Sequence, residues 1–421
     1  PTLTPADLSA EEWREALRAC KGMVLRQEVF ELDVDALNQG TEKPVRLYST
    51  AYHNSNITRL QPQGINRHAV FLVTESEAIT YNYELDLRKT APSPDPRIAH
   101  TLNLRFDEYG RALQSVAVVY PRLVPYAPPP NTLTPEQLAL IRAAQSERHL
   151  AYTETHFTDE LPKDPDRHRL PAPCEVLTYE LTGADSMEGF APSANGYFTL
   201  NDLRDFTLSD TLPGQGAKPV IRLDYHRQPN NQDAPKAHKR IVEWVRILYF
   251  KDDLSGPLDF GQPSGLGLIY ETYKLALTEM LLADVLKEKF DAAVRATLNT
   301  VSSSLWPQAE AGFLASGYQT NVVLFHANGP ASQWWMRSGV AGFANDAAQH
   351  FYLPEEYTDP FGNKTTLAYD GKYDLFIQSS ADALGNSSGV ALDHLGNLRF
   401  DYRVLAPIEM VDPNGNHTEV Y

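Results

Sequence analysis

Alternating apolar and polar positions, the pattern of half-buried strands, recur along most of the chain. Segments rich in β-branched and aromatic residues cover 68–73, 79–85, 101–106, 113–120, 219–226, 241–250 and 321–326. Successive side chains of a strand point to opposite faces, so a period of two indicates sheets with one buried face. Because turn-forming residues separate these segments, we expect mainly antiparallel sheets.

Helical periodicity is confined to three segments. The first covers residues 4–19 and the second residues 131–148, and each contains a Thr-Pro pair near its start, as helix N-termini often do. The third and strongest runs from Tyr270 to about Leu298, with apolar residues near i, i+3, i+4 and i+7. Its charged residues have both signs, which favours a helix packed on a sheet over one lying on lipid. Residues 121–130 and 227–238 are rich in Pro or polar turn formers and predict loops.

A five-residue phrase, Asp-x-x-Gly-Asn, recurs near the C-terminal end. Its defining positions are Asp359, Gly362 and Asn363; Asp382, Gly385 and Asn386; Asp393, Gly396 and Asn397; and Asp412, Gly415 and Asn416. Four copies between residues 359 and 416 exceed what turn composition alone explains. A looser form, Asp107-Glu108-Tyr109-Gly110-Arg111, lies between two predicted strands.

The phrase has the chemistry of a tight turn. An Asp side chain accepts a backbone hydrogen bond from two residues further on, and Gly adopts the positive φ that closes a hairpin. Strand-like segments such as 364–369 follow the turns. The sequence therefore predicts stacked hairpins, each of which buries its apolar face on its neighbours.

Charge and composition narrow the function classes. A net charge of −17 without a Lys/Arg-rich run argues against nucleic acid or an anionic membrane as the main partner. No stretch approaches the ~20 apolar residues of a membrane span, and the N-terminal residues have no signal-peptide pattern. Cys20 and Cys174 are too few for a disulfide framework in a chain of this length, so we expect two buried free thiols. Since the chain starts at Pro1 and stops at Tyr421 within a repeat, we expect it to be a fragment.

Known catalytic patterns are missing from the sequence. It contains no His-Glu-x-x-His, Gly-x-Ser-x-Gly or Gly-x-x-x-x-Gly-Lys motif. The densest polar cluster is Asp164, Asp166, Arg167, His168 and Arg169. It is suited to acid–base or metal chemistry, but the surrounding prolines favour a solvated loop. We expect no enzyme activity, no cofactor and no metal.

Three further features have alternative interpretations. The Asp residues of the repeat would bind Ca²⁺ if they faced one another, but one Asp and one Asn per turn supply too few oxygen ligands. Trp334-Trp335 is either a sugar-binding platform or, as the adjoining strand residues favour, a buried contact. His53, His68 and His100 lie in or beside predicted strands, where a hydrogen-bonded structural histidine is the simplest interpretation.

At the C-terminal end, the pattern resembles RHS or YD repeats, in which a Tyr-Asp pair follows the turn. The residues that carry this resemblance are 359–370 and 412–421, with Tyr369-Asp370 and Tyr373-Asp374. Upstream, the chain resembles the middle and C-terminal region of the B component of bacterial insecticidal toxin complexes, the Tc toxins. The matching segments, in chain order, are 20–31, 57–71, 78–83, 95–105, 246–255, 270–278, 333–338 and 348–363.

The resemblance implies a fold, partners and a role. It implies a mainly β fold, a large antiparallel ribbon of repeats that forms part of a hollow shell, with a few peripheral helices. Residues 1–350 would be shell wall and residues 351–421 RHS/YD repeats. The C component would complete the shell around an unfolded toxin cargo, and the A-component channel would dock through a propeller that this chain lacks. The protein would be secreted, with no direct membrane insertion and no nucleic-acid partner.

Two other function classes stay open. YD repeats also occur in cell-surface adhesion modules, which would show paired cysteines and exposed aromatic faces. A glycan-active or proteolytic enzyme on a β scaffold would need convergent carboxylates in a cleft. The low cysteine count argues against the first.

Overall fold

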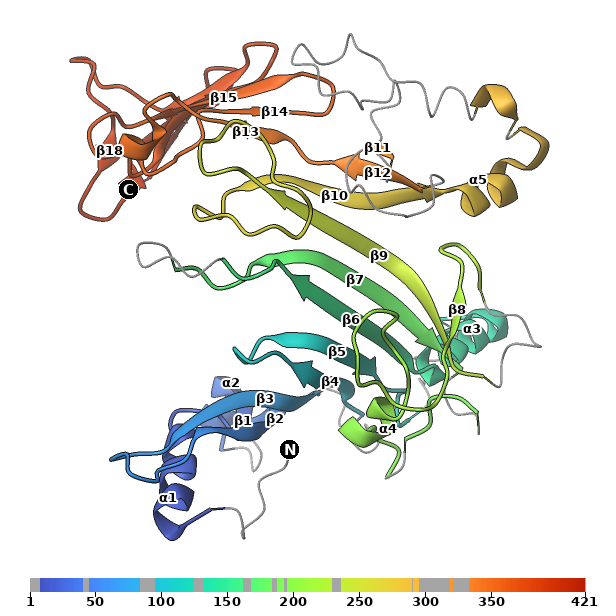
Figure 1. Ribbon diagram of the computed structural model, residues 1–421. Coiled ribbons are helices and arrows are strands. Elements are labelled where there is room, and N and C mark those ends of the chain that lie inside the picture. Colours follow the sequence, from blue (N-terminus) through green and yellow to red (C-terminus); the bar gives the residue numbers. More distant parts are fainter. Residues whose placement is uncertain are drawn as a thin grey trace. The chain divides into compact units, whose positions relative to one another are not determined.

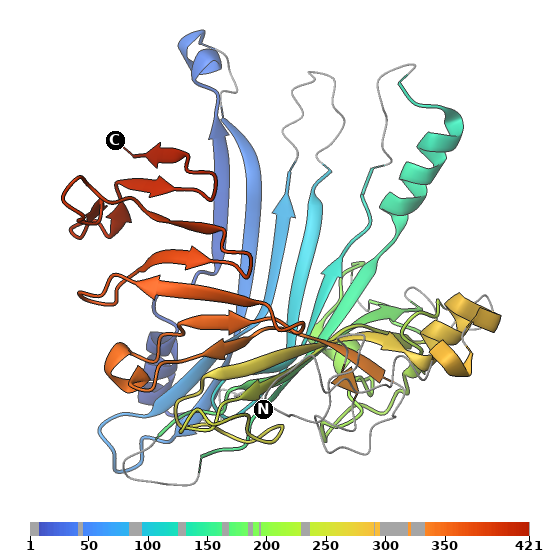
Figure 2. The same cartoon turned by 90° about the horizontal axis from the view of Figure 1, so that it is seen from above.

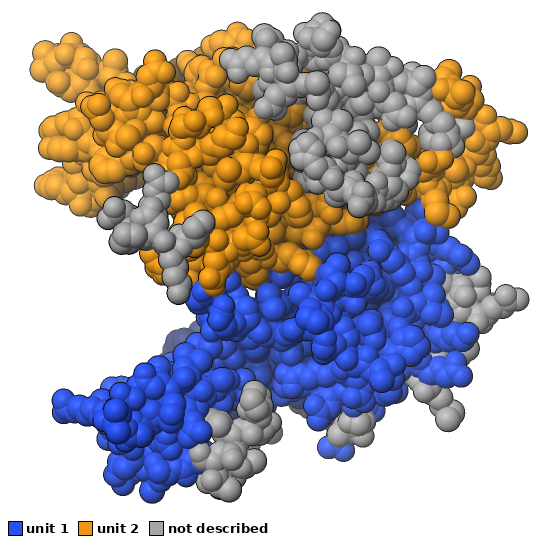
Figure 3. All heavy atoms as spheres, in the orientation of Figure 1, with its two compact units in different colours: residues 1–155, 176–243 blue, residues 156–175, 244–421 orange. Residues whose placement is uncertain are grey.

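The computed structural model describes residues 8–40, 45–83, 95–124, 132–161, 168–183, 188–192, 195–228, 236–289, 291–294, 319–320 and 333–420. Strands account for 43% and helices for 15% of these residues (Figure 1). The expectation of a mainly β fold with large antiparallel sheets is confirmed. The chain forms two compact units, residues 1–155 with 176–243 and residues 156–175 with 244–421 (Figure 3).

The first unit is built on strands that pair in chain order. They are β1 (Arg26–Leu32), β2 (Val45–Gln61), β3 (Val70–Asn82), β4 (Arg97–Phe106), β5 (Ala112–Val119), β6 (His149–Phe157), β7 (Pro173–Thr182), β8 (Ile221–Leu223) and β9 (His238–Tyr249). The order is β1-β2-β3-β4-β5-β6-β7-β9. Neighbours from β1 to β6 are antiparallel, whereas β8 pairs with β9 in parallel.

One face of this sheet forms the core of the first unit. Alternate residues of β4 and β5 are buried, and Ile98, Leu102 and Val116 are at most 2% exposed. The short helix α4 (Leu200–Arg204) packs against β4, with Leu203 fully buried. Arg204 Nε donates to the backbone oxygen of Leu104 at 3.0 Å.

Three other helices lie in the described part of the first unit. The predicted helices over 4–19 and 131–148 are observed as α1 (Ala10–Ala19) and α3 (Pro135–Ser146), although residues 4–7 lie outside the described residues. Each begins with a capping box, at Ser9 and at Thr134, which satisfies backbone N–H groups that a helix start leaves unpaired. Helix α2 (Val34–Asn38) is a single short turn.

The second unit continues with β10 (Ile269–Thr278), β12 (Gln333–Arg337) and β11 (Gln319–Thr320), each antiparallel to its neighbour. The prediction of a helix from Tyr270 to Leu298 was wrong over its first part, because residues up to Thr278 form β10. Helix α5 covers only Glu279–Leu286 and is followed by a 3₁₀ turn over Lys287–Lys289. Residues 290 and 295–298 lie outside the described residues.

The repeat forms its own antiparallel sheet in the second unit. Its order is β13 (Val340–Gly342), β14 (Glu356–Thr358), β15 (Lys364–Tyr369), β16 (Ile377–Ala381), β17 (Ser387–Val390), β20 (Glu409–Val411) and β21 (His417–Glu419). Figure 2 shows these strands, orange to red, side by side. A separate hairpin joins β18 (Phe400–Asp401) and β19 (Ala406–Pro407), and a 3₁₀ turn covers Ala347–His350.

Strand boundaries differ from the predictions in several places. Residues 70–73 and 79–82 of two predicted strands belong to one long strand, β3, and segment 219–226 contains only the short strand β8. Segment 321–326 lies outside the described residues, as do 125–130 and 229–235 of the two predicted loops. Strands β1, β2, β6 and β7 were not predicted.

Candidate functional site

The four Asp-x-x-Gly-Asn turns have one shared geometry. In each, the Asp Oδ1 accepts the backbone N–H groups two and four residues on, at 2.8–2.9 Å. The Asn Nδ2 donates to the Asp Oδ2 at 2.8–3.1 Å. The backbone closes with Gly N–H donating to the Asp oxygen at 3.0 Å, and every Gly has φ between 78° and 86°. Both carboxylate oxygens are therefore engaged in holding the turn.

The turns are arranged by the sheet. Asp359–Asn363 joins β14 to β15, Asp382–Asn386 joins β16 to β17, and Asp412–Asn416 joins β20 to β21. Because neighbouring strands are antiparallel, these three turns lie at the same edge of the sheet. The turn at Asp393–Asn397 is closed by the bridge between Leu392 and Leu398, after β17.

The carboxylates of the turns remain ionised at neutral pH. Hydrogen bonds from Asn386 to Asp382 and from Asn416 to Asp412 lower the pKa of each Asp. At Asp393 the backbone N–H of Asn397 has the largest effect in lowering the pKa. At Asp359, burial raises the pKa, but the hydrogen bonds from Asn363 outweigh it. The turns thus gain stability above the ordinary Asp pKa and lose it as the pH falls through the lowered values.

The Tyr369-Asp370 pair organises the opposite edge of the same sheet. Tyr369, the last residue of β15, donates its hydroxyl to the Pro354 oxygen at 2.9 Å. The buried Asp370 accepts the backbone N–H of Leu375 at 2.9 Å and the Tyr402 hydroxyl at 3.2 Å. This carboxylate therefore connects the loop after β15 to the segment after β18.

Two hollows lie near residues that the sequence singled out. One lies between the first two turns and includes Tyr357, Asp359, Lys364, Asp382 and Leu384 in its lining. Its lysine is paired with Glu356 at 2.8 Å, and its Asp residues are those that hold the turns.

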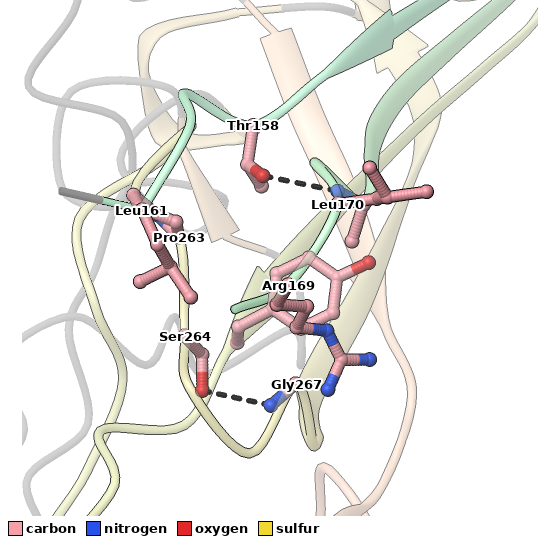
Figure 4. A pocket seen from close by; sticks show the side chains of 9 residues that line it. Thr158, Leu161, Arg169, Leu170, Pro263, Ser264 and Gly267 are labelled. Atoms are coloured by element: carbon pink, nitrogen blue, oxygen red, sulfur yellow. Dashed lines mark hydrogen bonds between the residues drawn. The ribbon is translucent and has the colours of Figure 1, made fainter. Parts of the chain in front are cut away.

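The other hollow is a cavity of about 10 Å³, lined by Thr158, Arg169, Ser264 and Gly267 among others (Figure 4). That volume is about the space for one water molecule, so the cavity is too small for a substrate. Arg169 donates to the Leu266 oxygen at 2.5 Å. His168 is exposed, and Asp164, Asp166 and Arg167 of the same polar cluster lie outside the described residues.

The other singled-out residues have structural contacts. Trp334 and Trp335 are 2% and 0% exposed, so the buried interpretation of this pair is correct. His53 contacts Glu75 at 2.7 Å and His68 contacts Glu15 at 2.6 Å. Cys174 is buried and Cys20 partly exposed, both as free thiols.

The buried charged residues were not predicted from the sequence. In the second unit, Arg337 of β12 and Glu271 of β10 form an ion pair at 2.6 Å with both side chains at most 2% exposed. In the first unit, the buried Glu154 accepts hydrogen bonds from Tyr152 at 2.7 Å and Ser209 at 2.8 Å. Glu271 and Glu154 each occupy an alternating buried position of a strand, which is the signal that would have found them.

The described part of the chain brings together no group of three or more His, Cys, Asp or Glu side chains arranged to hold a metal ion. No helix among the described residues is long and apolar enough to cross a membrane. The described residues form mainly antiparallel sheets whose ionised side chains hold turns and strands together. This arrangement defines a β-structured repeat protein.

Comparison with known proteins narrows this class. Residues 15–170 match the family model of the insecticide toxin TcdB middle/C-terminal region. The fold resembles the solved Tc holotoxin pore of Photorhabdus luminescens, with a TM-score of 0.58. It also resembles the TcdB2–TccC3 complex without its hypervariable C-terminal region, with a TM-score of 0.55, and TcdB2-TccC3-TEV, with a TM-score of 0.59.

Each of these structures is 20% identical to this chain over its full length, and the chain spans 16% of the matched chain. No curated protein matches the sequence. The resemblance to the B component of Tc toxins is therefore confirmed by the family model over residues 15–170, and the likeness of the fold extends over the whole chain.

Proposed function

We propose that this chain is a wall segment of a Tc toxin B component, which with a C component forms a β-shell around an unfolded toxin cargo before its passage through the A channel. The observation that carries the proposal is the succession of antiparallel strands that pair in chain order, in a fold that resembles structures of B and C components together. In this role residues 1–350 are wall and residues 351–421 are repeats, and the complex is secreted.

The physical argument concerns the state of the cargo. An unfolded chain exposes apolar surface and aggregates or is degraded in solution. A wall of paired strands excludes proteases and other chains, and pairing each strand with the next leaves few edges open. The repeat turns contribute by fixing hairpin register through the hydrogen bonds of their own Asp and Asn side chains.

Co-expression with a C component tests the proposal. We expect the protein that carries this chain to co-purify with the C component as a hollow particle with internal density in electron micrographs. We also expect the enclosed cargo to survive a protease that digests it when the C component is expressed alone. A compact solid particle, or no association, would contradict the shell and favour an adhesion module.

A matched pair of variants locates the effect in this chain. Gly385→Ala strains one repeat turn, whereas Leu140→Lys changes an exposed position of helix α3. We expect the first to lower the yield of protected cargo and the second to leave it unchanged.

A further inference from the structure

A histidine occupies the buried face of β4 in the first unit. His100 alternates with Ile98 and Leu102 on that face, and it is 2% exposed. Its Nε2 lies 2.8 Å from Glu77 Oε1, and its Nδ1 lies 2.9 Å from the Tyr120 hydroxyl. A polar chain therefore crosses from β3 through β4 to the residue after β5.

The partners determine where the protons are. A carboxylate only accepts hydrogen bonds, so Nε2 carries the proton that it donates to Glu77. In the neutral ring Nδ1 is then bare, and it accepts the hydroxyl proton of Tyr120. Burial raises the pKa of Tyr120 to about 12, so its hydroxyl keeps that proton.

The Tyr120 hydroxyl oxygen can also accept a hydrogen bond, and through it Tyr120 binds a second part of the chain. Its oxygen accepts the backbone N–H of Phe198 at 2.9 Å. Phe198 is 1% exposed and lies just before Thr199, the N-cap of α4. We refer to residues 197–204 as the covering segment, because α4 packs on β4.

A second proton on His100 disrupts this arrangement. Nδ1–H and the Tyr120 O–H would then point at each other, and the hydroxyl proton would have to turn away from its acceptor. The tyrosine is 7% exposed, and an unmade hydrogen bond in such a site is costly. The protonated ring also places a cation among apolar neighbours.

The charged and titratable groups around the ring oppose or favour this proton to different degrees. Burial lowers the pKa of His100, and the contact with Glu77 raises it less. The Arg148 guanidinium lies 5.6 Å from the Tyr120 ring centroid and 5.5 Å from that of Phe198. Tyr197 packs edge-on against Tyr120. Burial raises the pKa of Tyr81, which is hydrogen-bonded to Tyr197.

We propose that the chain of Glu77, His100 and Tyr120 is an acid-sensitive latch, which holds the covering segment on the sheet at neutral pH and releases it when His100 becomes protonated. A histidine freed by opening regains its ordinary pKa. The closed state therefore keeps its full stability above the ordinary histidine pKa and loses it as the pH falls towards the lowered value. The inference is independent of the shell function.

Amide hydrogen exchange of the full chain tests the latch. The quantity to compare is the protection factor of the Phe198 amide at pH 7.5 and pH 5.5, with the Val118 amide of β5 as internal reference. One pH unit below the ordinary histidine pKa, protection should fall by about ten-fold, while that of Val118 stays constant. Equal protection of Phe198 at both pH values would overturn the proposal.

Three variants distinguish the latch from a general sensitivity of the fold to acid. His100→Asn keeps an acceptor near the position of Nδ1 but cannot be protonated, so it should keep Phe198 protected at both pH values. Tyr120→Phe should leave Phe198 weakly protected at both. His350→Asn, an exposed histidine of the second unit, should keep the fall seen in the unaltered chain. A fall that persists in His100→Asn would overturn the latch.

The tautomer can be measured without any substitution. The nitrogen-15 NMR spectrum of the His100 ring at pH 7.5 should show a protonated Nε2 and a bare Nδ1. A proton on Nδ1 at that pH would overturn the proposal even if His100→Asn failed to fold.

Discussion

Each repeat turn depends on three residues with separate tasks. The looser turn at Asp107 shows that the Asn of the repeat turn can be replaced, because Arg111 occupies the position of the Asn in this turn. Arg111 Nε donates to Asp107 Oδ2 at 2.6 Å, and Gly110 has φ of 82°. The fifth position therefore needs a side-chain donor, the first an acceptor, and the fourth a residue that adopts positive φ.

Substitution of Gly385 tests the need for a positive φ at the fourth position of the turn. Its φ is +84°, and an added Cβ would meet no atom within 4 Å, so the cost is conformational rather than steric. We expect Gly385→Ala to lower the free energy of unfolding by about 1 kcal/mol, and Gly385→Asn to lower it less because Asn tolerates the left-handed region. Urea unfolding measures both. Equal losses for the two variants would show that the strain lies elsewhere.

His350 gives the second unit the opposite pH response to that of His100. Its Nδ1 lies 2.8 Å from Asp374 Oδ2, and this hydrogen bond, with Asp346 nearby, raises the pKa of His350. Stability from this contact is present below the ordinary histidine pKa and lost as the pH rises through the raised value. We expect His350→Gln to lower the urea midpoint at pH 6 and to leave it unchanged at pH 9. The same loss at both pH values would mean that packing, not charge, is responsible.

At the scale of elements, the sequence predicted those features that depend on residues close together in the chain. The turns and the helix start at Thr134 depend on residues a few positions apart, so the sequence alone indicates them. The first helix was predicted from residue 4, and its cap at Ser9 was not predicted. Strand β10 was predicted as helix because Tyr273 and Leu277 continue the helical spacing of the apolar residues in α5. The strand also contains a buried glutamate, Glu271. That glutamate is tolerated because Arg337 neutralises it, and no local pattern reports a partner 66 positions away.

Removal of one partner should therefore be far worse than removal of both. Arg337→Met would leave Glu271 buried without its cation, and we expect a loss of about 3–5 kcal/mol in the free energy of unfolding. The double variant Glu271→Leu with Arg337→Met should recover most of that loss. Arg14, in an exposed pair with Glu11, is the control, and Arg14→Ala should cost less than about 1 kcal/mol. Chemical unfolding measures the free energy of unfolding of the unaltered chain, the single variant, the double variant and the control. A double variant as unstable as the single would show that the pair itself stabilises the strands.

At the scale of the whole molecule, the order of the strands follows the order of the chain almost throughout. Each hairpin brings the next strand beside the last, so most pairing requires only short loop closures. The alternation of the sequence implies this arrangement in outline. It does not indicate where pairing stops, since an edge strand has the same alternation as an inner one.

Strand β1 is such an edge among the described strands, because the strand order begins with it and it pairs with β2. Its residues Val29, Phe30 and Leu32 are 43–53% exposed, and an open apolar edge is a template for pairing with another chain. We therefore expect concentration-dependent association of the isolated chain in sedimentation velocity. Phe30→Lys should reduce it, because charge on an edge strand opposes pairing. Leu140→Lys, at a 72% exposed position of helix α3, should leave it unchanged. A chain that stays monomeric at every concentration would show that this edge is protected without a partner, and equal effects of the two lysines would assign the association to exposed apolar surface in general.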